Sequence, residues 1–348
     1  MSEYLHITNG DSAADIIENC GIGGDVLSWR DPMHHGPFLP GLSLDKLSRI
    51  RIDYLAGETT SPQESLSSSG QHEFSERDAV LATAHEYEEV ILWYEHDLLD
   101  QLQILQLLDW FAKSNTSTFK LSLICVDRFD GVPNFRGIGQ LTSEQMASLQ
   151  TTRQPVSRRQ QEQAQKIWTA FCSPEPHTLL KLINNVALMS NLAIPFMAPA
   201  LMRHCQEFPW ISDGLSRTER QILNLVMKGV TKPTRVFLDN MDFESCLYIG
   251  DWRSYSQIAE LCNAKQPLLA CVSGADFEHA RSTNLSAAEF AEQELCVTEC
   301  GKQVLDGTTS ATRCIERNSW LGGVHLNSDA ELWLWDDIKA VFQLTKDR

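Results

Sequence analysis

Short apolar runs alternate with segments of helical periodicity over the first 130 residues. The apolar runs predict strands at 4–8, 25–29, 90–94 and 121–126. The run Val90–Tyr94 is apolar at every position, which indicates a strand covered on both faces of its sheet. Alternating strands and helices are typical of βαβ units, so we expect a Rossmann-like α/β domain with a mostly parallel sheet.

Two polar segments interrupt this alternation. Residues 30–37 are rich in proline and glycine and predict a loop. Residues 57–72 are the least hydrophobic stretch of the chain, and we expect a mobile loop there.

Beyond residue 142 the pattern becomes mainly helical. It predicts helices near 156–172, 176–190, 196–207 and 216–228, the last of which begins with a Ser216-x-x-Glu219 capping box. The last third adds helices near 254–263 and 286–294 and a tail rich in tryptophan. We therefore predict an α/β domain over 1–140, a helical region over 141–235 and an α+β region over 236–348.

The segment 216–228, a later helix and the stretch Thr298–Leu305 together resemble a winged-helix-like unit. The charge distribution bears on what such a unit would bind. The net charge is −17, and residues 1–150 carry 9 Lys and Arg against 23 Asp and Glu. Residues 151–235 carry 11 against 5, and residues 236–348 carry 9 against 18. DNA binding requires a basic face, so only 151–235 is a candidate for contact with nucleic acid, and packing or protein contact is the favoured role of the unit.

The ten cysteines are scattered singly, with no Cys-x-x-Cys pair. Only Cys296 and Cys300 have a spacing that brings two thiols to one helix face, and no further ligand pair completes a zinc site near them. We therefore expect reduced, mostly buried thiols, as in cytoplasmic proteins.

No run of about 18 apolar residues occurs, so we expect no membrane-spanning helix. The N-terminal residues lack the basic and apolar regions of a signal peptide. Both observations predict a cytoplasmic protein.

Polar and titratable residues follow each of the four predicted strands. In a parallel sheet the carboxyl ends of the strands share one rim, where ligands bind. The residues that we expect at this rim are Asn9, Gly10, Asp11, Ser12, Asp31, His34, His35, Glu95, His96, Asp97, Asp100, Gln101 and Asp127. Ordinary roles stay open for some of them, because Ser12 and Asp97 are suitable helix N-caps and Gly10 suits a turn.

Three chemistries are compatible with this set. A divalent metal could be held by Asp11, Asp97 and Asp127, with His34, His35 or His96 as a further ligand. The catalytic groups would then be Asp11, His35, Glu95 and Asp97, and the remaining rim residues would bind the ligand.

Two alternatives do without a metal. The helix that follows Gly10 could hold an anion at its N-terminus, although Asp11 opposes this. The order strand, Gly10-Asp11-Ser12, helix is also similar to the opening of the Gly-Asp-Ser esterases, with Ser12 as nucleophile. Those enzymes carry Asp-x-x-His near the end of the chain, whereas here that spacing occurs only from Asp31 to His34, so this alternative is disfavoured.

Four strings of the chain resemble a bacterial family known as domain of unknown function 1835. They are Asn9-Gly10-Asp11-Ser12 and the segments 29–37 (Trp-Arg-Asp-Pro-Met-His-His-Gly-Pro), 93–101 (Trp-Tyr-Glu-His-Asp-Leu-Leu-Asp-Gln) and 320–325 (Trp-Leu-Gly-Gly-Val-His). The resemblance implies a bacterial, cytoplasmic protein. It implies no activity, substrate or catalytic residue.

The leading hypothesis is therefore a site for a small ligand or a divalent metal at the sheet rim, acting on a phosphate-bearing or nucleotide substrate. The runner-up is a non-enzymatic regulator, whose N-terminal domain senses a ligand while the C-terminal half contacts protein or nucleic acid. A third class, a purely structural interaction protein, would have no ligand pocket at the rim.

Overall fold

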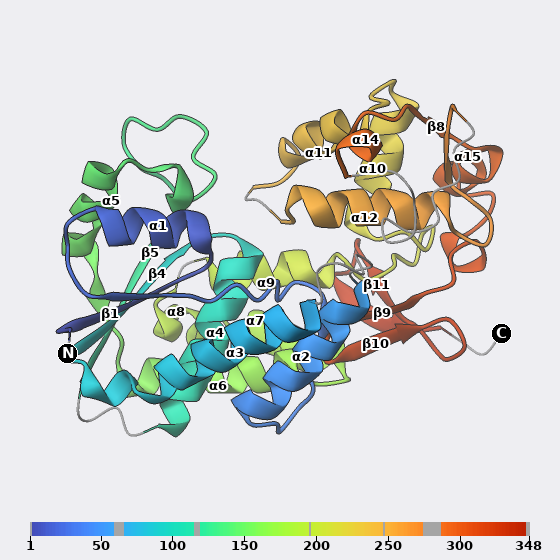
Figure 1. Ribbon diagram of the computed structural model, residues 1–348. Coiled ribbons are helices and arrows are strands. Elements are labelled where there is room, and N and C mark those ends of the chain that lie inside the picture. Colours follow the sequence, from blue (N-terminus) through green and yellow to red (C-terminus); the bar gives the residue numbers. More distant parts are fainter. Residues whose placement is uncertain are drawn as a thin grey trace.

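A five-stranded sheet organises the N-terminal half of the protein, as seen in the computed structural model (Figure 1). The structure describes residues 2–58, 66–114, 119–194, 196–245, 248–273 and 287–345. The strands are β1 (Tyr4–Thr8), β2 (Asp25–Ser28), β4 (Glu89–Glu95), β5 (Lys120–Val126) and β6 (Gln154–Pro155).

The order of the strands is β2-β1-β4-β5-β6. The first four are parallel, and β6 is antiparallel to β5. All seven residues of β4 are buried, as its continuous apolar run predicts. The predicted Rossmann-like, mostly parallel α/β fold is confirmed.

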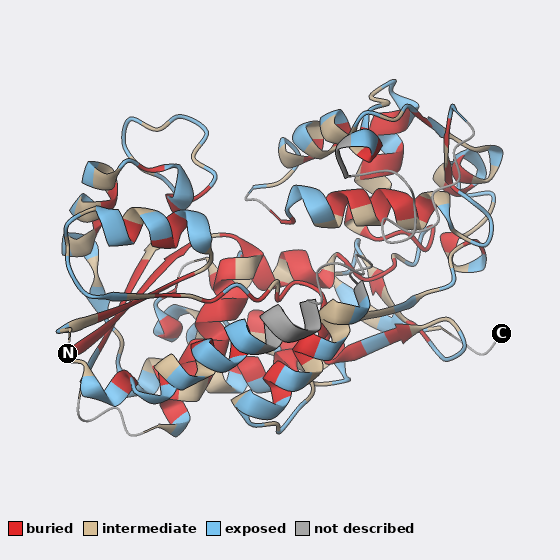
Figure 2. Ribbon diagram, viewed as in Figure 1, coloured by how far each residue is buried: buried red, intermediate tan, exposed pale blue. Residues whose placement is uncertain are grey.

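Helices cover both faces of the sheet (Figures 1 and 2). On one face, α1 (Asp11–Asn19) and α5 (Ser143–Leu149) pack on side chains such as Ile91 and Trp93. The core on the other face includes α4 (Leu98–Lys113), of which 13 residues are buried. The strand alternation therefore divides β4 between two apolar cores.

The segment expected to be a mobile loop, 57–72, is helical at both of its ends. Helix α2 (Leu44–Glu58) extends into it from one side and α3 (Leu66–Ala82) from the other, while 59–65 lie outside the described residues. Low hydrophobicity marks exposed positions, and the backbone can still be helical there. A short 3-10 helix, η1 (Ala84–Glu86), leads into β4.

Four helices after the sheet join the same core as the sheet. They are α6 (Arg158–Phe171), α7 (Pro176–Ile183), α8 (Val186–Leu192) and α9 (Met197–Cys205). One helix was expected over 176–190, but the Asn185 side chain accepts a hydrogen bond from Leu188 N and begins a new helix. Since α6 to α9 share the core of the sheet, the boundary expected at residue 140 does not separate two cores.

A second core gathers residues between Leu215 and Cys314. Its elements are α10 (Arg217–Met227), α11 (Pro233–Met241), α12 (Asp251–Cys262), β7 (Leu269–Cys271), α14 (Ala287–Ala291), β8 (Leu295–Val297) and α15 (Glu299–Leu305). The capping box predicted at Ser216 is confirmed, with Glu219 as its second member. Strands β7 and β8 pair antiparallel, and α14 lies between them in the chain. The winged-helix-like character of this unit stays a prediction. The boundary expected at residue 235 falls inside this core.

The C-terminal part of the chain pairs with a segment of its N-terminal part. The loop strand β3 (Gly36–Pro37) pairs with β9 (Asn318–Gly322), which pairs in turn with β10 (Val324–Asn327). The final hairpin is formed by β11 (Trp333–Asp336) and β12 (Val341–Leu344). The segment 30–37, predicted to be a loop, thus ends in a short strand whose partner lies 285 positions downstream (Gly36 and Leu321, 321 − 36).

The described residues agree with the expectations of no membrane-spanning helix and of reduced cysteines. None of the described helices combines the length and the apolar character needed to cross a membrane. The nine cysteines in the described ranges are free thiols. The Sγ atom of Cys300 lies 3.1 Å from that of Cys314, so the neighbour of Cys300 is Cys314 and not Cys296.

Candidate functional site

The strand order reverses between β1 and β4. From β1 the chain passes to β2 on one side, and it later places β4 on the opposite side of β1. At such a reversal the connections leave in opposite directions and open a crevice beyond the carboxyl ends of the strands, which is where open α/β sheets bind ligands. Asn9 follows β1 and Glu95 ends β4, so both lie at this point.

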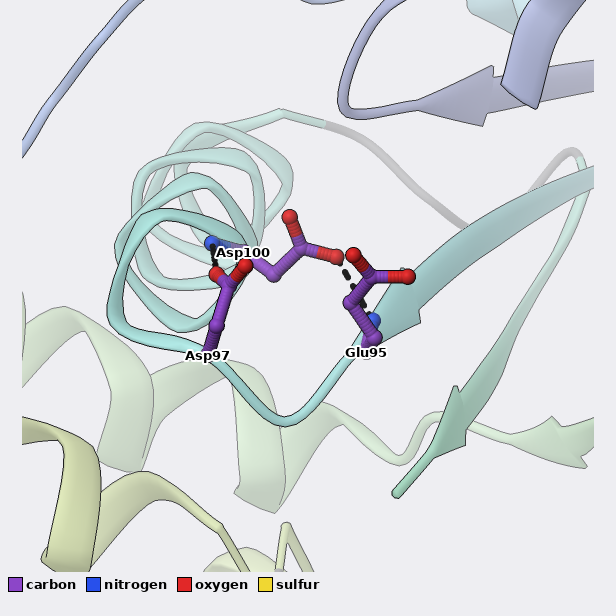
Figure 3. A group of neighbouring side chains, drawn as sticks. All are labelled: Glu95, Asp97 and Asp100. Carbon is purple, nitrogen blue, oxygen red and sulfur yellow. Dashed lines mark hydrogen bonds between the residues drawn. The ribbon is translucent and has the colours of Figure 1, made fainter. Parts of the chain in front are cut away.

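Three buried carboxylates gather at this position (Figure 3). Glu95, Asp97 and Asp100 each offer an oxygen, and these atoms all lie within 4.8 Å of one another. Glu95, Asp97 and Asp100 are 5%, 5% and 0% exposed to solvent, respectively. No other group of three His, Cys, Asp or Glu in the described ranges has this geometry.

The start of α4 holds the cluster together. Asp97 is the N-cap of α4, and its Oδ1 accepts a hydrogen bond of 2.8 Å from Asp100 N. The Oδ2 atom of Asp100 accepts one of 2.6 Å from Glu95 N (Figure 3). Gln101 donates through Nε2 to the carbonyl oxygen of Glu95 at 2.7 Å. The turn between strand and helix therefore directs all three carboxylates to the same side.

Two further segments complete the surroundings of the cluster. Asn9 Nδ2 lies 2.8 Å from Asp100 Oδ1 and 3.4 Å from Glu95 Oε1, so its amide bridges the two carboxylates. The backbone N–H of Ile138, at the start of the 3-10 helix η3 (Ile138–Gln140), donates to Glu95 Oε2. A Cβ on the preceding Gly137 would lie 2.3 Å from Glu95 Oε1, so only glycine allows this approach of the backbone.

Burial makes the charged forms of these carboxylates unfavourable. It raises the pKa of Glu95 to about 8, with the charge of Asp97 as a second cause. It raises the pKa of Asp97 to about 6, against the N-cap hydrogen bonds. The pKa of Asp100 is well above its ordinary value because of burial and the charges of Asp97 and Glu95. No described Lys or Arg forms an ion pair with any of the three.

The histidines predicted at the rim do not join the carboxylate group within the described residues. His96 is near Asp127, whose charge raises its pKa, but burial has the larger effect and lowers it overall. His34 is buried, and neither of its ring nitrogens has a hydrogen-bond partner. Its ring lies 4.8 Å from that of His35 and 6.2 Å from that of Tyr248, so His34 packs against the chain that leads into α12. The ring of His35 lies 6.0 Å from that of Tyr54 in α2.

Three of the predicted acids lie elsewhere. Asp11 is the first residue of α1, is 61% exposed at its side chain and pairs with Arg30. Asp31 is buried against Arg51 in an ion pair of 2.7 Å. Asp127 is 40% exposed at its side chain. The structure therefore does not assemble the expected metal set of Asp11, Asp97 and Asp127, and Asp97 has Glu95 and Asp100 as neighbours instead.

The turn after β1 also differs from expectation. Helix α1 begins at Asp11, one residue before the expected cap Ser12, and its N-cap is Gly10 in an extended conformation with φ −172°. Ser12 is exposed, and it faces the Gly139 backbone rather than a histidine. Among the residues of this turn, Asn9 is the one that touches the carboxylates.

Gly137 and Ile138 were missed by the sequence analysis. The short string Gly137-Ile138-Gly139 is the only local signal, and it does not tell which side chain the backbone approaches. Their partner Glu95 lies more than 40 positions earlier in the chain, so only the folded structure connects them.

Replacing Gly137 by alanine is expected to lower the free energy of unfolding by about 1–3 kcal/mol, because the new methyl group overlaps the Glu95 carboxylate. Urea unfolding measures this loss. Gly57→Ala is the matched control: its Cβ meets nothing within 4 Å, and an alanine in α2 stabilises a helix by up to about 1 kcal/mol. Equal effects of both changes would show that Gly137 is not packed against the cluster.

Four of the eleven basic residues of 151–235 form ion pairs with largely buried acids, and the other seven are exposed. Arg153 pairs with Glu89, Arg217 with Glu244 and Arg220 with Asp213. The buried Arg203 lies between Glu207 and Glu244. The exposed residues include Arg158 and Arg159, so contact of this segment with nucleic acid stays a prediction.

A scan against protein-family models finds no match to this chain, and a search of curated proteins finds none either.

Proposed function

We propose that Glu95, Asp97 and Asp100 form a divalent-cation site at the point where the strand order reverses, and that this site holds a small phosphate-bearing or nucleotide ligand. The observation that carries the proposal is the set of three buried carboxylates with oxygens within 4.8 Å of one another. Oxygen ligands from carboxylates are what Mg²⁺ and Ca²⁺ prefer in proteins.

The electrostatics of the cluster support a cation. Three carboxylates in so small a buried volume repel one another when charged, and no described Lys or Arg offsets them. Burial and the charge of Asp97 raise the pKa of Glu95 to about 8, so without a cation the cluster retains protons. A divalent ion would displace these protons and replace the repulsion by attraction.

The surroundings support a phosphate-bearing ligand. A carboxylate-bound Mg²⁺ keeps open positions that substrate phosphates commonly fill. The site also lies at the rim where open α/β sheets bind such ligands, next to the Asn9 amide. In this proposal Glu95, Asp97 and Asp100 hold the ion, and Asn9 and Gln101 position them.

The test is calorimetric titration of the chelator-treated protein with Mg²⁺, Mn²⁺ and Ca²⁺. We expect one ion per chain, and a stabilisation of about 2.7 kcal/mol at an ion concentration 100 times the Kd. The double variant Glu95→Gln, Asp100→Asn should bind at least tenfold more weakly. The matched control Asp11→Asn, Asp127→Asn removes the same charge at exposed positions and should bind as the wild type does.

Absence of cation binding to folded wild-type protein would refute the proposal, as would equal losses in the two double variants. If the ion binds, titration with a nucleoside diphosphate in its presence tests the ligand class, and binding that does not require the ion would contradict it.

The resemblance to the family of domain of unknown function 1835 stays a prediction, and so do a cytoplasmic location and a bacterial origin. None of them bears on the chemistry of this site. The regulator hypothesis also stays a prediction.

A further inference from the structure

A pocket lies at the C-terminal end of α4, whereas the carboxylates lie at its N-terminal end. It has a volume of about 200 Å³. Its walls come from the start of α2, the last two turns of α4 and one residue of α6, which Figure 1 shows on the same side of the sheet. Gln106, which lines it, is nine positions after Asp97, or about 13 Å along the helix. The pocket is therefore separate from the proposed cation site.

The walls of this pocket are mainly apolar, and two indoles contribute to them. Leu42, Leu44 and Leu47 line one side, and Trp110 and Trp168 line others. Engineered cavities of about 150 Å³ with apolar walls bind benzene, so a cavity of this size suits a flat bicyclic molecule.

The wall formed by Trp168 is held in place by its neighbours. Its ring lies 5.5 Å from Phe171 in a stacked arrangement and 5.6 Å from Phe38 edge to face. Trp168 itself is 7% exposed. A rigid aromatic wall requires little reorganisation when a flat ligand binds against it.

Gln106 places a side-chain amide in this mainly apolar lining. The residue is 4% exposed, and its Oε1 accepts a hydrogen bond of 2.9 Å from Trp29 Nε1. Because an indole nitrogen can only donate, this bond fixes which end of the amide is oxygen. The Nε2 group is the other end, and no described residue accepts a hydrogen bond from it. A ligand in the pocket that offers an acceptor would therefore gain a hydrogen bond from this group.

The charges at the pocket edge cancel each other. Lys113 Nζ lies 2.6 Å from Asp109 Oδ2, so the two ends of this ion pair leave no net charge on the lining. Because the pair leaves no net charge and most of the lining is apolar, an uncharged ligand fits better than an ion, whose hydration is costly to lose.

We infer that this pocket binds a small, flat, uncharged aromatic molecule that carries a hydrogen-bond acceptor, with Gln106 Nε2 as the donor. The indoles of Trp110 and Trp168 contact its faces or edges, and the leucines of the α2 side cover the remainder.

Quinoline is a suitable probe because its ring nitrogen is an acceptor, and indole is its matched control, a bicycle of similar size that offers a donor instead. We expect quinoline to bind with a Kd below about 1 mM and about fivefold more tightly than indole. The readout is the set of indole N–H signals from the nine tryptophans in a nitrogen-15 NMR spectrum. The signals of Trp110, Trp168 and Trp29 should shift, and the other six should not.

Two variants complete the test. Gln106→Met keeps the size of the side chain and removes the donor, so quinoline should lose its preference over indole. Because this change also leaves Trp29 Nε1 without a partner, Leu44→Trp serves as a second variant: it fills the pocket from its edge and should weaken both probes at least tenfold. Shifts spread over all nine signals, no shifts at all, or tighter binding of indole would each overturn the inference.

Discussion

In the presence of a chelator, the protein is expected to lose roughly 4 kcal/mol of stability as the pH rises from about 5 to about 8, and Glu95→Gln is expected to remove most of this loss. The cause is the pKa of Glu95, which burial and the charge of Asp97 raise from 4.5 to about 8. Between these two values the folded state binds a proton that the unfolded state has released. Stability therefore falls as the pH rises through this window.

The neighbouring groups reinforce the direction of this effect. The pKa of Asp97 is raised to about 6 and that of Asp100 is well above its ordinary value, both mainly through burial, so both groups also favour the folded state at low pH. The hydrogen bonds from Asn9 and from Ile138 N stabilise the charged form of Glu95 and only partly oppose burial.

Urea unfolding at a series of pH values, at constant ionic strength, measures the effect. Glu95→Gln should match the wild type near pH 5 and be more stable near pH 8. Buried histidines such as His34 and His204, whose pKa values are lowered, add their own pH dependence, but it cancels in the difference between variant and wild type. Asp11→Asn, an exposed carboxylate, is the control and should follow the wild type throughout. A variant that retains the full loss would show that Glu95 is ionised in the folded protein.

Arg51→Met is expected to lower the free energy of unfolding by about 3–5 kcal/mol. Arg51 and Asp31 are 0% and 1% exposed at their side chains, and the pair is 2.7 Å long. Arg51 also donates to the carbonyl oxygens of His35 and Pro32, at 2.8 and 3.2 Å, and its guanidinium lies 4.4 Å from the centre of the Phe38 ring. The substitution would leave a buried carboxylate and two carbonyl oxygens without their hydrogen-bond donor. Buried acceptors without a donor lower the free energy of unfolding more than the loss of an exposed hydrogen bond does.

The matched control is Arg30→Met, the same chemical change at an ion pair whose partners are 47% and 61% exposed. Exposed pairs contribute about 0–1 kcal/mol, so this variant should unfold nearly as the wild type does. Adding Asp31→Asn to Arg51→Met should recover part of the loss, because the unpaired buried charge is then gone. Equal effects of the two arginine substitutions would contradict the role assigned to Arg51.

Arg51 also explains why the segment 30–37 is ordered in spite of its composition. Gly36 has φ +87°, and a Cβ there would lie 2.0 Å from Arg51 Nη1. The glycine that suggested an irregular loop is thus needed so that the arginine can reach the loop carbonyls. His34 and His35 are carried into the protein interior by the same arrangement, away from the carboxylate rim.

The local pattern of apolar and polar residues was sufficient to predict the strands of the sheet and part of the candidate site. Strand positions follow from apolar runs, because a buried strand must be apolar on each face that is covered. The placement of Asp97 as a cap follows from its position at the start of an apolar helix. Since Asn9 and Glu95 end neighbouring parallel strands, their meeting at one rim could also be predicted, and the structure brings their side chains within 3.4 Å.

The same reasoning misplaced Asp11. Asp11 lies two positions after Asn9 in the chain, but it is the first residue of α1, and the first turn of this helix directs its side chain to Arg30 and solvent. Asp100, in the first turn of α4, instead accepts a hydrogen bond from the end of β4. Which way a side chain leaves a helix terminus depends on where the helix begins to within one residue, and sequence patterns do not resolve that.

The sequence alone therefore determined the parallel α/β architecture, the capped start of α4 and the rim at which polar residues meet. Only the tertiary structure decided which carboxylates share a buried volume. It also decided that the backbone of Gly137 and Ile138 contacts Glu95, and that Asp31 pairs with Arg51 instead of joining the rim. The physical reason is range: periodicity and capping depend on residues a few positions apart, whereas burial, and with it the pKa of Glu95, depends on segments that only the folded chain brings together.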